Sequence, residues 1–237
     1  MRRARHPDAR CGTCHMHQNV CICGLVPRIE TQTHLVLVLH QLETKKPTNT
    51  GVLATRCLPN SRIVVRGQHQ PVPNETLWPD THDPVLLFPT EDARPLADLL
   101  AERPAGAKPI ALVVPDGTWS QASRARRRIP CLSQIPAATV TVDGPSIYRL
   151  RTANEPGQVC TLEAIALAFE HLEGSHGPRV REQLHTMLRI MVERTLWTRG
   201  ELQASEVTGG IPAGARPDRP WESVANHPGD RPKTEAE

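Results

Sequence analysis

The sequence predicts an α/β fold in which a mostly parallel β-sheet is flanked by helices. Short apolar runs, each long enough for a strand, recur along the first 142 residues. They lie at residues 35–39, 63–65, 85–88, 110–114 and 138–142. The first run, LVLVL, is continuous, as in a strand buried on both faces. Strands that alternate with helical segments are typical of a parallel sheet covered on both sides.

The segments between and after these runs have helical patterns. They lie at residues 49–58, 96–104, 118–129, 161–172 and 180–197. In the segment 161–172, Leu162, Ile165 and Phe169 fall on one stripe, and we expect Thr161 to cap the helix start. In the segment 118–129, Thr118 is the expected cap and Gln121 its capping-box partner.

The length and composition fit one globular α/β domain with extensions. The chain has 237 residues, a formal net charge of +3 and 38% hydrophobic residues, which excludes a collagen-like or acidic solvating polymer. We expect a Cys-rich segment over residues 1–28, the α/β domain over 29–198 and a disordered tail over 199–237, where Gly, Pro and charged residues dominate. No apolar run reaches the roughly 20 residues that span a bilayer, and the basic N-terminus lacks the apolar core of a secretory signal. We therefore expect a cytoplasmic protein without a membrane partner.

Four of the seven cysteines lie close together near the N-terminus. They follow the spacing Cys11-x2-Cys14-x6-Cys21-x-Cys23. Such density suits metal binding in a reducing compartment better than a disulfide framework, and four thiolates can close a tetrahedral, structural zinc site. His15 or His17 could replace one cysteine, and four unligated thiols are the alternative.

Asp116 stands at the turn that follows the strand 110–114. Gly117 permits a sharp turn there, and the following helix does not need Asp116 if Thr118 is its cap. Ligands of open α/β sheets bind beyond the carboxyl ends of the strands. Asp116 is therefore a candidate functional residue. Trp119 has two interpretations: it packs on the sheet as an anchor at the helix start, or it belongs to a site.

Polar residues also follow the first predicted strand. His40 and Glu43 come directly after it, and Asn49 and Thr50 can cap the next helix. Backbone donors at that helix start could hold a carboxylate or a phosphate. Lys45 and Lys46 lie in the same loop and either assist such binding or serve solubility alone.

A basic cluster follows Trp119 on the helix 118–129. Arg124, Arg127 and Arg128 lie opposite the apolar face that Ala122 and Ile129 help to form. Such a cluster attracts phosphates or is an ordinary solvated face.

Three stretches together resemble the DTW-domain family. DGTW is similar to the Asp-x-Thr-Trp signature of the family, H..E....TNTG.LA...LPNS to its first conserved block and R.........TLEA to its last. The match runs in the expected order from about Cys11 to Leu172. Gln41 stands where the family often has Pro, and Cys160 where it often has Ser; neither change removes a reactive group.

The resemblance implies a tRNA-uridine aminocarboxypropyltransferase. Such enzymes move the 3-amino-3-carboxypropyl group of S-adenosylmethionine to N3 of a tRNA uridine and release methylthioadenosine. It also implies a SPOUT-like domain with a C-terminal trefoil knot, tRNA as the partner and no obligate protein partner. The alternatives are a related S-adenosylmethionine-dependent RNA methyltransferase, an aminocarboxypropyltransferase for ribosomal RNA, and a non-catalytic, zinc-bearing RNA-binding module.

The resemblance and the residue patterns assign three sets of site residues. The catalytic set, in which Asp116 is the candidate base for the N3 proton, is Asp116, Thr118 and Trp119. The set for S-adenosylmethionine is His40, Glu43, Asn49, Thr50, Arg151, Thr161 and Glu163. The set for RNA is Lys45, Lys46, Arg124, Arg127 and Arg128. Within the second set, Thr161 with its following amides, or Arg151, is expected to hold the methionine carboxylate.

Overall fold

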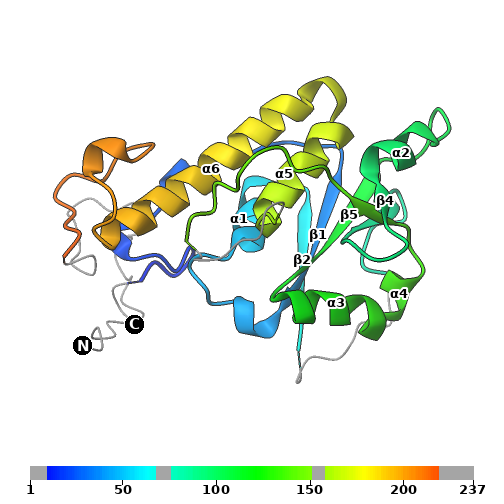
Figure 1. The fold of residues 1–237 in the computed structure, drawn as a ribbon, viewed down its shortest axis with the longest axis horizontal. Helices are drawn as coiled ribbons and strands as arrows, with labels where there is room; N and C mark the ends of the chain where they lie inside the picture. Colours follow the sequence, from blue (N-terminus) through cyan, green and yellow to red (C-terminus); the bar gives the residue numbers. More distant parts are fainter. Residues whose placement is uncertain (1–9, 68–75, 151–157, 219–237) are drawn as a thin grey trace, which may run out of the picture.

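The computed structural model describes residues 10–67, 76–150 and 158–218, which form a parallel sheet with helices on both faces (Figure 1). Within these residues the strand order is β2-β1-β5-β3-β6-β4, and every pairing is parallel. The strands are β1 (His34–His40), β2 (Ser61–Arg66), β3 (Asp83–Leu87), β4 (Arg94–Pro95), β5 (Ile110–Asp116) and β6 (Ala137–Thr139). The α/β class and the five predicted strands are confirmed. The additional strand, β4, has two residues, too few for any apolar pattern.

The central strands β1 and β5 carry the most continuous apolar runs. Leu35–Leu39 and all of β5 are buried. The register pairs Leu39 with Asp116 and His40 with Arg66, so the carboxyl ends of β5, β1 and β2 meet at one edge of the sheet. Polar residues that end these strands are thereby brought together.

Helices cover the two faces of the sheet in separate groups. The helices are α1 (Thr50–Cys57), α2 (Leu96–Ala101), α3 (Trp119–Arg128), α4 (Pro130–Ser133), α5 (Thr161–Leu172) and α6 (Gly177–Thr198). Figure 1 shows α5 and α6 on one side of the sheet and α3 and α4 on the other. Along β1, Leu37 packs in the core beneath α1, α5 and α6, whereas Val38 packs in the core beneath α3 and α4.

Neighbouring strands β1 and β5 continue into helices on opposite faces. The chain leaves β1 for α1 and then β2, and it leaves β5 for α3 and then β6. The two connections therefore diverge, which opens a crevice at the carboxyl ends of β1 and β5. This crevice contains Asp116.

The longest helix of the described residues, α6, has one buried apolar face. Val180, Leu184, Met187, Leu188 and Met191, the predicted face, are all buried. The helix begins three residues before the predicted start, because Pro178 fits the first turn, where its missing N–H is not needed. Within the described part of the chain, no helix is both long enough and apolar enough to cross a membrane.

Two helix starts agree with the predicted caps and one does not. Asn49 Oδ1 accepts from Val52 N at 2.7 Å, and Thr118 forms its capping box with Gln121. For α5, however, the cap is Cys160 and not Thr161: Cys160 N donates to Glu163 at 2.8 Å, and Thr161 is the first helical residue. The hydroxyl of Thr161 is consequently available for a different contact.

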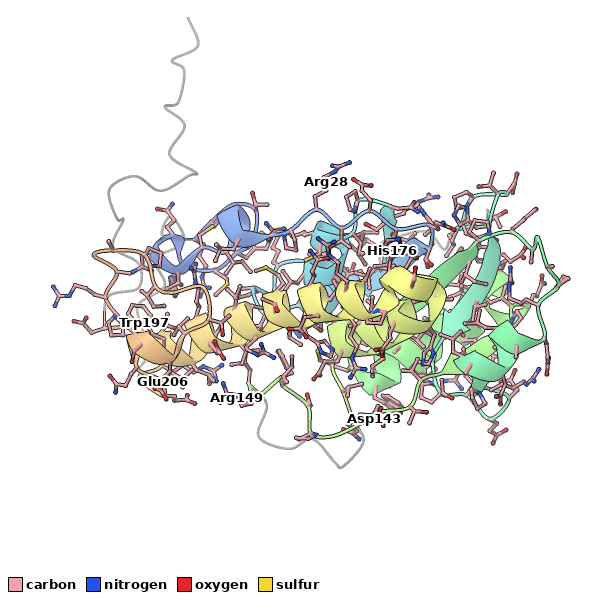
Figure 2. All side chains as sticks on the ribbon, turned by 90° about the horizontal axis from the view of Figure 1, so that it is seen from above. Arg28, Asp143, Arg149, His176, Trp197 and Glu206 are labelled. Atoms are coloured by element: carbon pink, nitrogen blue, oxygen red, sulfur yellow. The ribbon has the colours of Figure 1, made fainter. Side chains whose placement is uncertain are left out.

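The prediction of a disordered tail from residue 199 is wrong for residues 199–218. This segment contains a short 3-10 helix at Ala204–Glu206, buries Val207 and accepts hydrogen bonds from Arg194 of α6 at the carbonyl of Gly210. Figure 2 shows Glu206 beside Trp197 at the C-terminal end of α6. A few apolar side chains hold the segment despite its polar composition. Residues 219–237 lie outside the described residues.

Candidate active site

A cavity of about 600 Å³ opens at the carboxyl edge of the sheet. Its volume falls in the range of about 300–1,000 Å³ that small-molecule sites occupy. Seven of the predicted site residues line it: Glu43, Lys46, Asn49, Thr50, Asp116, Trp119 and Thr161. The topology therefore brings residues from β5 and the starts of α1, α3 and α5 to one place.

Asp116 lies at the base of this arrangement, with its carboxylate held from two helices. The residue is 5% exposed. Asn49 Nδ2 donates to Asp116 Oδ2 at 2.6 Å, and Thr161 Oγ1 donates to Asp116 Oδ1 at 2.5 Å. An ionised carboxylate accepts but does not donate, so both contacts suit the charged form. They also fix its orientation toward the cavity.

Two glycines make the close approach of these elements possible. At Gly51, an added Cβ would lie 2.8 Å from Leu37 Cδ1 and 3.0 Å from Asp116 Cγ. Gly117 has φ +148, which disfavours residues with a side chain, and its Cβ would lie 2.7 Å from Gln121 Oε1. A side chain at position 51 would displace Leu37 or Asp116, and one at position 117 would strain the backbone and displace the Gln121 side chain.

The starts of α1 and α5 both border the cavity, through Asn49 and Thr50 on one helix and Cys160 and Thr161 on the other. A helix N-terminus carries a partial positive charge and unpaired N–H groups. Two such ends at one cavity favour an anionic ligand group there. The carboxylate of Asp116 lies in the positive potential of these helix ends, and a ligand carboxylate can bind in the same potential.

Trp119 is not the buried anchor that one interpretation expected. It is 67% exposed, lines the cavity and lies with its ring centroid 5.2 Å from that of Phe88. Ala122 and Ala125, which are smaller, make the contact between α3 and the sheet. Trp119 stands at the first position of α3, beyond the strand ends, so its indole presents a free aromatic surface at the cavity.

Glu43 and Lys46 form an ion pair at the cavity wall. Lys46 Nζ lies 2.6 Å from Glu43 Oε1, and the side chain of Glu43 is 8% exposed while that of Lys46 is 53% exposed. The buried carboxylate therefore has a cation of its own. Lys45 is exposed and is not among the lining residues.

Three of the predicted site residues serve the surrounding structure instead of the cavity wall. Thr118 caps α3. Glu163 accepts from Cys160 N, Ile147 N and Ser146 Oγ at 2.7–2.8 Å, which ties the loop before α5 to the helix start. His40 Nδ1 accepts from Leu42 N at 3.3 Å, and burial, with a smaller effect of Arg66, lowers its pKa. Arg151 lies outside the described residues.

Other residues at the cavity were not in the predicted set. Tyr148 is buried and donates from its hydroxyl to Thr48 O at 3.3 Å. Cys160 lines the wall, and burial raises the pKa of its thiol. Arg199, assigned to the tail from composition, also lines the cavity. Cys160 directly precedes the TLEA motif, so the sequence could have indicated it. Nothing in the sequence near Arg199 indicates a site.

The basic cluster of α3 faces solvent. Arg124, Arg127 and Arg128 are exposed. Arg126, on the other side of the helix, pairs with Asp92 through two contacts of 2.5 and 2.6 Å. The three predicted RNA-binding arginines therefore share one exposed side of α3.

The four N-terminal cysteines form a compact cluster that could hold a metal ion. Their Sγ atoms all lie within 4.8 Å of one another, and the Cys11–Cys23 and Cys14–Cys21 distances are both 3.6 Å. Zinc–sulfur bonds of about 2.3 Å in a tetrahedron place sulfurs about 3.8 Å apart, so the cluster fits structural zinc. His15 and His17 do not belong to the group.

Arginines surround the cysteine cluster. Arg56 Nη2 of α1 donates to Cys23 Sγ at 3.0 Å, and Arg194 Nη1 of α6 donates to Cys21 O at 2.6 Å. Four thiolates around a divalent ion carry a net negative charge, which these guanidinium groups offset. The same two contacts attach the N-terminal segment to α1 and α6.

Comparison with known proteins identifies the family. The model of the DTW domain matches residues 8–196. The chain is 28% identical to tRNA-uridine aminocarboxypropyltransferase 2 of Mus musculus over 71% of its own length and 57% of that protein, so it spans less than two thirds of this relative. It is 27% identical to the Drosophila melanogaster protein of the same name, over 78% of the chain and 75% of the relative. It is 28% identical to tRNA-uridine aminocarboxypropyltransferase A of Arabidopsis thaliana, over 80% of the chain and 81% of that protein. No solved structure matches it. The chain belongs to the DTW domain family.

Proposed function

We propose that the protein transfers the 3-amino-3-carboxypropyl group of S-adenosylmethionine to N3 of a uridine in tRNA. The observation that carries this proposal is the buried carboxylate of Asp116, held by Asn49 and Thr161 at the wall of a ligand-sized cavity. The names of the relatives support the same reaction.

The cavity suits S-adenosylmethionine in its walls as well as its volume. Apolar side chains such as Phe88, Val114 and Val140 line it, and the helix starts at Thr50 and Thr161 border it. The apolar walls suit the adenosyl group, and the helix N-termini suit the methionine carboxylate. When bound, the sulfonium makes its attached carbons electrophilic, so the protein must select the propyl carbon by position.

Asp116 acts in this proposal as the general base. The N3–H bond of uracil breaks, a bond forms from N3 to the propyl carbon, and the bond between this carbon and sulfur breaks with its electrons left on sulfur. The proton passes to Asp116. Asn49 and Thr161 keep the carboxylate aimed at the cavity during the transfer. A positioned base of this kind contributes roughly 10²–10⁴ in rate.

Trp119 and the arginines of α3 receive the RNA in this proposal. The target uridine must leave its stack to expose N3, and the exposed indole of Trp119 offers a surface for stacking of about 1–3 kcal/mol. Arg124, Arg127 and Arg128 then neutralise backbone phosphates on the exposed side of α3.

The proposal also covers the metal, the location and the topology of the protein, which we infer from the cysteines and the family resemblance. The cluster of four cysteines binds structural zinc, for which the sulfur distances are suited. None of the seven cysteines forms a disulfide, which suits a cytoplasmic location. The domain is SPOUT-like with a C-terminal trefoil knot; an experimental structure that traces residues 140–161 continuously would test this topology.

The reaction is tested with purified protein, S-adenosylmethionine and an unmodified tRNA transcript. After digestion to nucleosides, mass spectrometry should find uridine carrying the aminocarboxypropyl group, and methylthioadenosine should form in equal amount. A ribosomal RNA fragment replaces the tRNA in a parallel reaction. A methylated nucleoside, product only on ribosomal RNA, or RNA binding without any product would each contradict the proposal in a different way.

A further inference from the structure

Among the residues that the structure describes, Arg66 is a buried cation without an acidic partner. It ends β2, is 8% exposed and makes one hydrogen bond, from Nη2 to the carbonyl of Gln121. Its Nε is buried and has no hydrogen-bond partner. Within the described residues no carboxylate pairs with it. Because a guanidinium group stays charged in proteins, such burial without a counter-charge is unfavourable.

The groups around Arg66 add positive charge. Burial, and after it the neighbouring charge of Arg128, lowers the pKa of Arg66. His40, the register partner of Arg66 on β1, lies near enough for Arg66 to contribute to its lowered pKa. The acidic group that acts on His40 is Glu43, which is bonded to Lys46. An anion from outside the chain would supply the missing charge.

This cationic group lies on the edge of the sheet that holds Asp116. The strand β1 separates β2 from β5, so Arg66 and Asp116 lie two strand spacings apart, roughly 10 Å. His40 Cβ would be 3.3 Å from a Cβ at Gly117, the residue after Asp116. Because Arg66 pairs with His40 and Asp116 pairs with Leu39, the two side chains leave opposite faces of the sheet, and an anion at Arg66 would lie on the α3 side of this edge.

We propose that Arg66, together with Arg128, binds a phosphate group of the RNA backbone next to the target uridine. The planar, forked donors of arginine match phosphate oxygens better than a lysine ammonium does. This inference rests on the proposed function, because it takes RNA as the source of the phosphate. The alternative is a structural role, in which Arg66 only holds the first turn of α3 through Gln121.

The salt dependence of tRNA binding distinguishes these two roles. We compare wild type, Arg66→Gln, Arg128→Gln and the double variant, without S-adenosylmethionine, by fluorescence anisotropy over a series of salt concentrations. Loss of one phosphate contact should reduce the slope of log K against log salt by about 0.7–0.9. Arg62→Gln is the matched control, since Arg62 is an exposed arginine at the opposite end of β2.

The expected result is a smaller slope for Arg66→Gln and for Arg128→Gln. In the double variant the two reductions in slope should not add, because both arginines bind one phosphate. The slope of Arg62→Gln should not change. A lower melting temperature of Arg66→Gln with an unchanged slope would overturn the proposal in favour of the structural role. If Arg66→Gln does not fold, Arg66→Lys replaces it in the test. This variant keeps the charge, so the slope should stay as in wild type while the affinity for tRNA falls. An unchanged slope for Arg128→Gln would also count against the shared site.

Inorganic phosphate separates this inference from the proposed function. It should raise the melting temperature of wild type more than that of Arg66→Gln. If wild type binds phosphate in this way but binds no tRNA, the proposed RNA substrate is wrong and the anion is a free one. If phosphate stabilises both proteins equally while tRNA binds, the function stands and the site at Arg66 does not.

Discussion

The two polar clusters of the protein lie at opposite ends of α1 and are built in different ways. At the C-terminal end, Arg56 contacts the cysteine cluster, whose members all lie between Cys11 and Cys23. At the N-terminal end, Asn49 contacts Asp116, 67 residues away in the chain, and Asp116 contacts Thr161, 45 residues further on. One cluster is local in sequence, whereas the other exists only once the sheet has formed.

This difference determines what a change in each cluster should do. The cysteines bring their own ligands together, and the core around them, including Met16 and Ile22, joins the core beneath α1 and α6. Damage there should act on stability. The residues around Asp116 depend on the strand order and contribute few apolar contacts, so damage there should act on the reaction.

The largest expected effect is that of Asp116→Asn on the rate. Without the base, kcat should fall at least about 100-fold, while the Kd for S-adenosylmethionine, measured by calorimetry, stays nearly unchanged. Asp143→Asn, at an exposed position, is the control. If the Kd rises as much as kcat falls, Asp116 binds the amino group of the cofactor and is not the base.

Removal of metal should have the next largest effect, and it should act on stability. Cys14→Ser should lose bound zinc, measured by atomic absorption, and the melting temperature should fall by more than about 5 °C, because metal binding contributes folding free energy. Cys131→Ser is the control, since Cys131 is half-buried but outside the cluster. Equal melting temperatures with and without a chelator would show that the cluster holds no structural metal.

The sequence predicts the local features well and the assembled ones only in part. The cysteine spacing, the cap at Asn49 and the helix 161–172 depend on neighbouring residues, and each is seen in the structure. One of the two interpretations of Trp119 placed it on the sheet, but a helix's first residue projects beyond the strand end, which periodicity does not show. Arg199 reaches the cavity only through the packing of α6, a contact without any local signal.

Thr161→Val tests the Asp116 cluster with a smaller change. The variant keeps the shape of the side chain but removes the hydrogen bond to Asp116 Oδ1, and a bond to a charged group contributes about 1.5–3 kcal/mol. We expect kcat to fall roughly tenfold, because part of this energy is recovered by water or Asn49. Thr141→Val, at an exposed position, should leave kcat unchanged. A rate equal to wild type would mean that the Thr161 contact does not position the base.

The smallest expected effect belongs to Arg56→Gln, which tests whether α1 connects its two ends. Loss of the contact to Cys23 Sγ should weaken zinc retention against a chelator and lower the melting temperature by about 2–4 °C, as a loss of about 1 kcal/mol does in a chain of this size. Arg28→Gln, at an exposed position, is the control. Because Asn49 is held independently by Val52 N, kcat and the Kd for S-adenosylmethionine should not change. If both change together with zinc retention, α1 transmits the state of the cysteine cluster to Asp116, and the two clusters function as one unit.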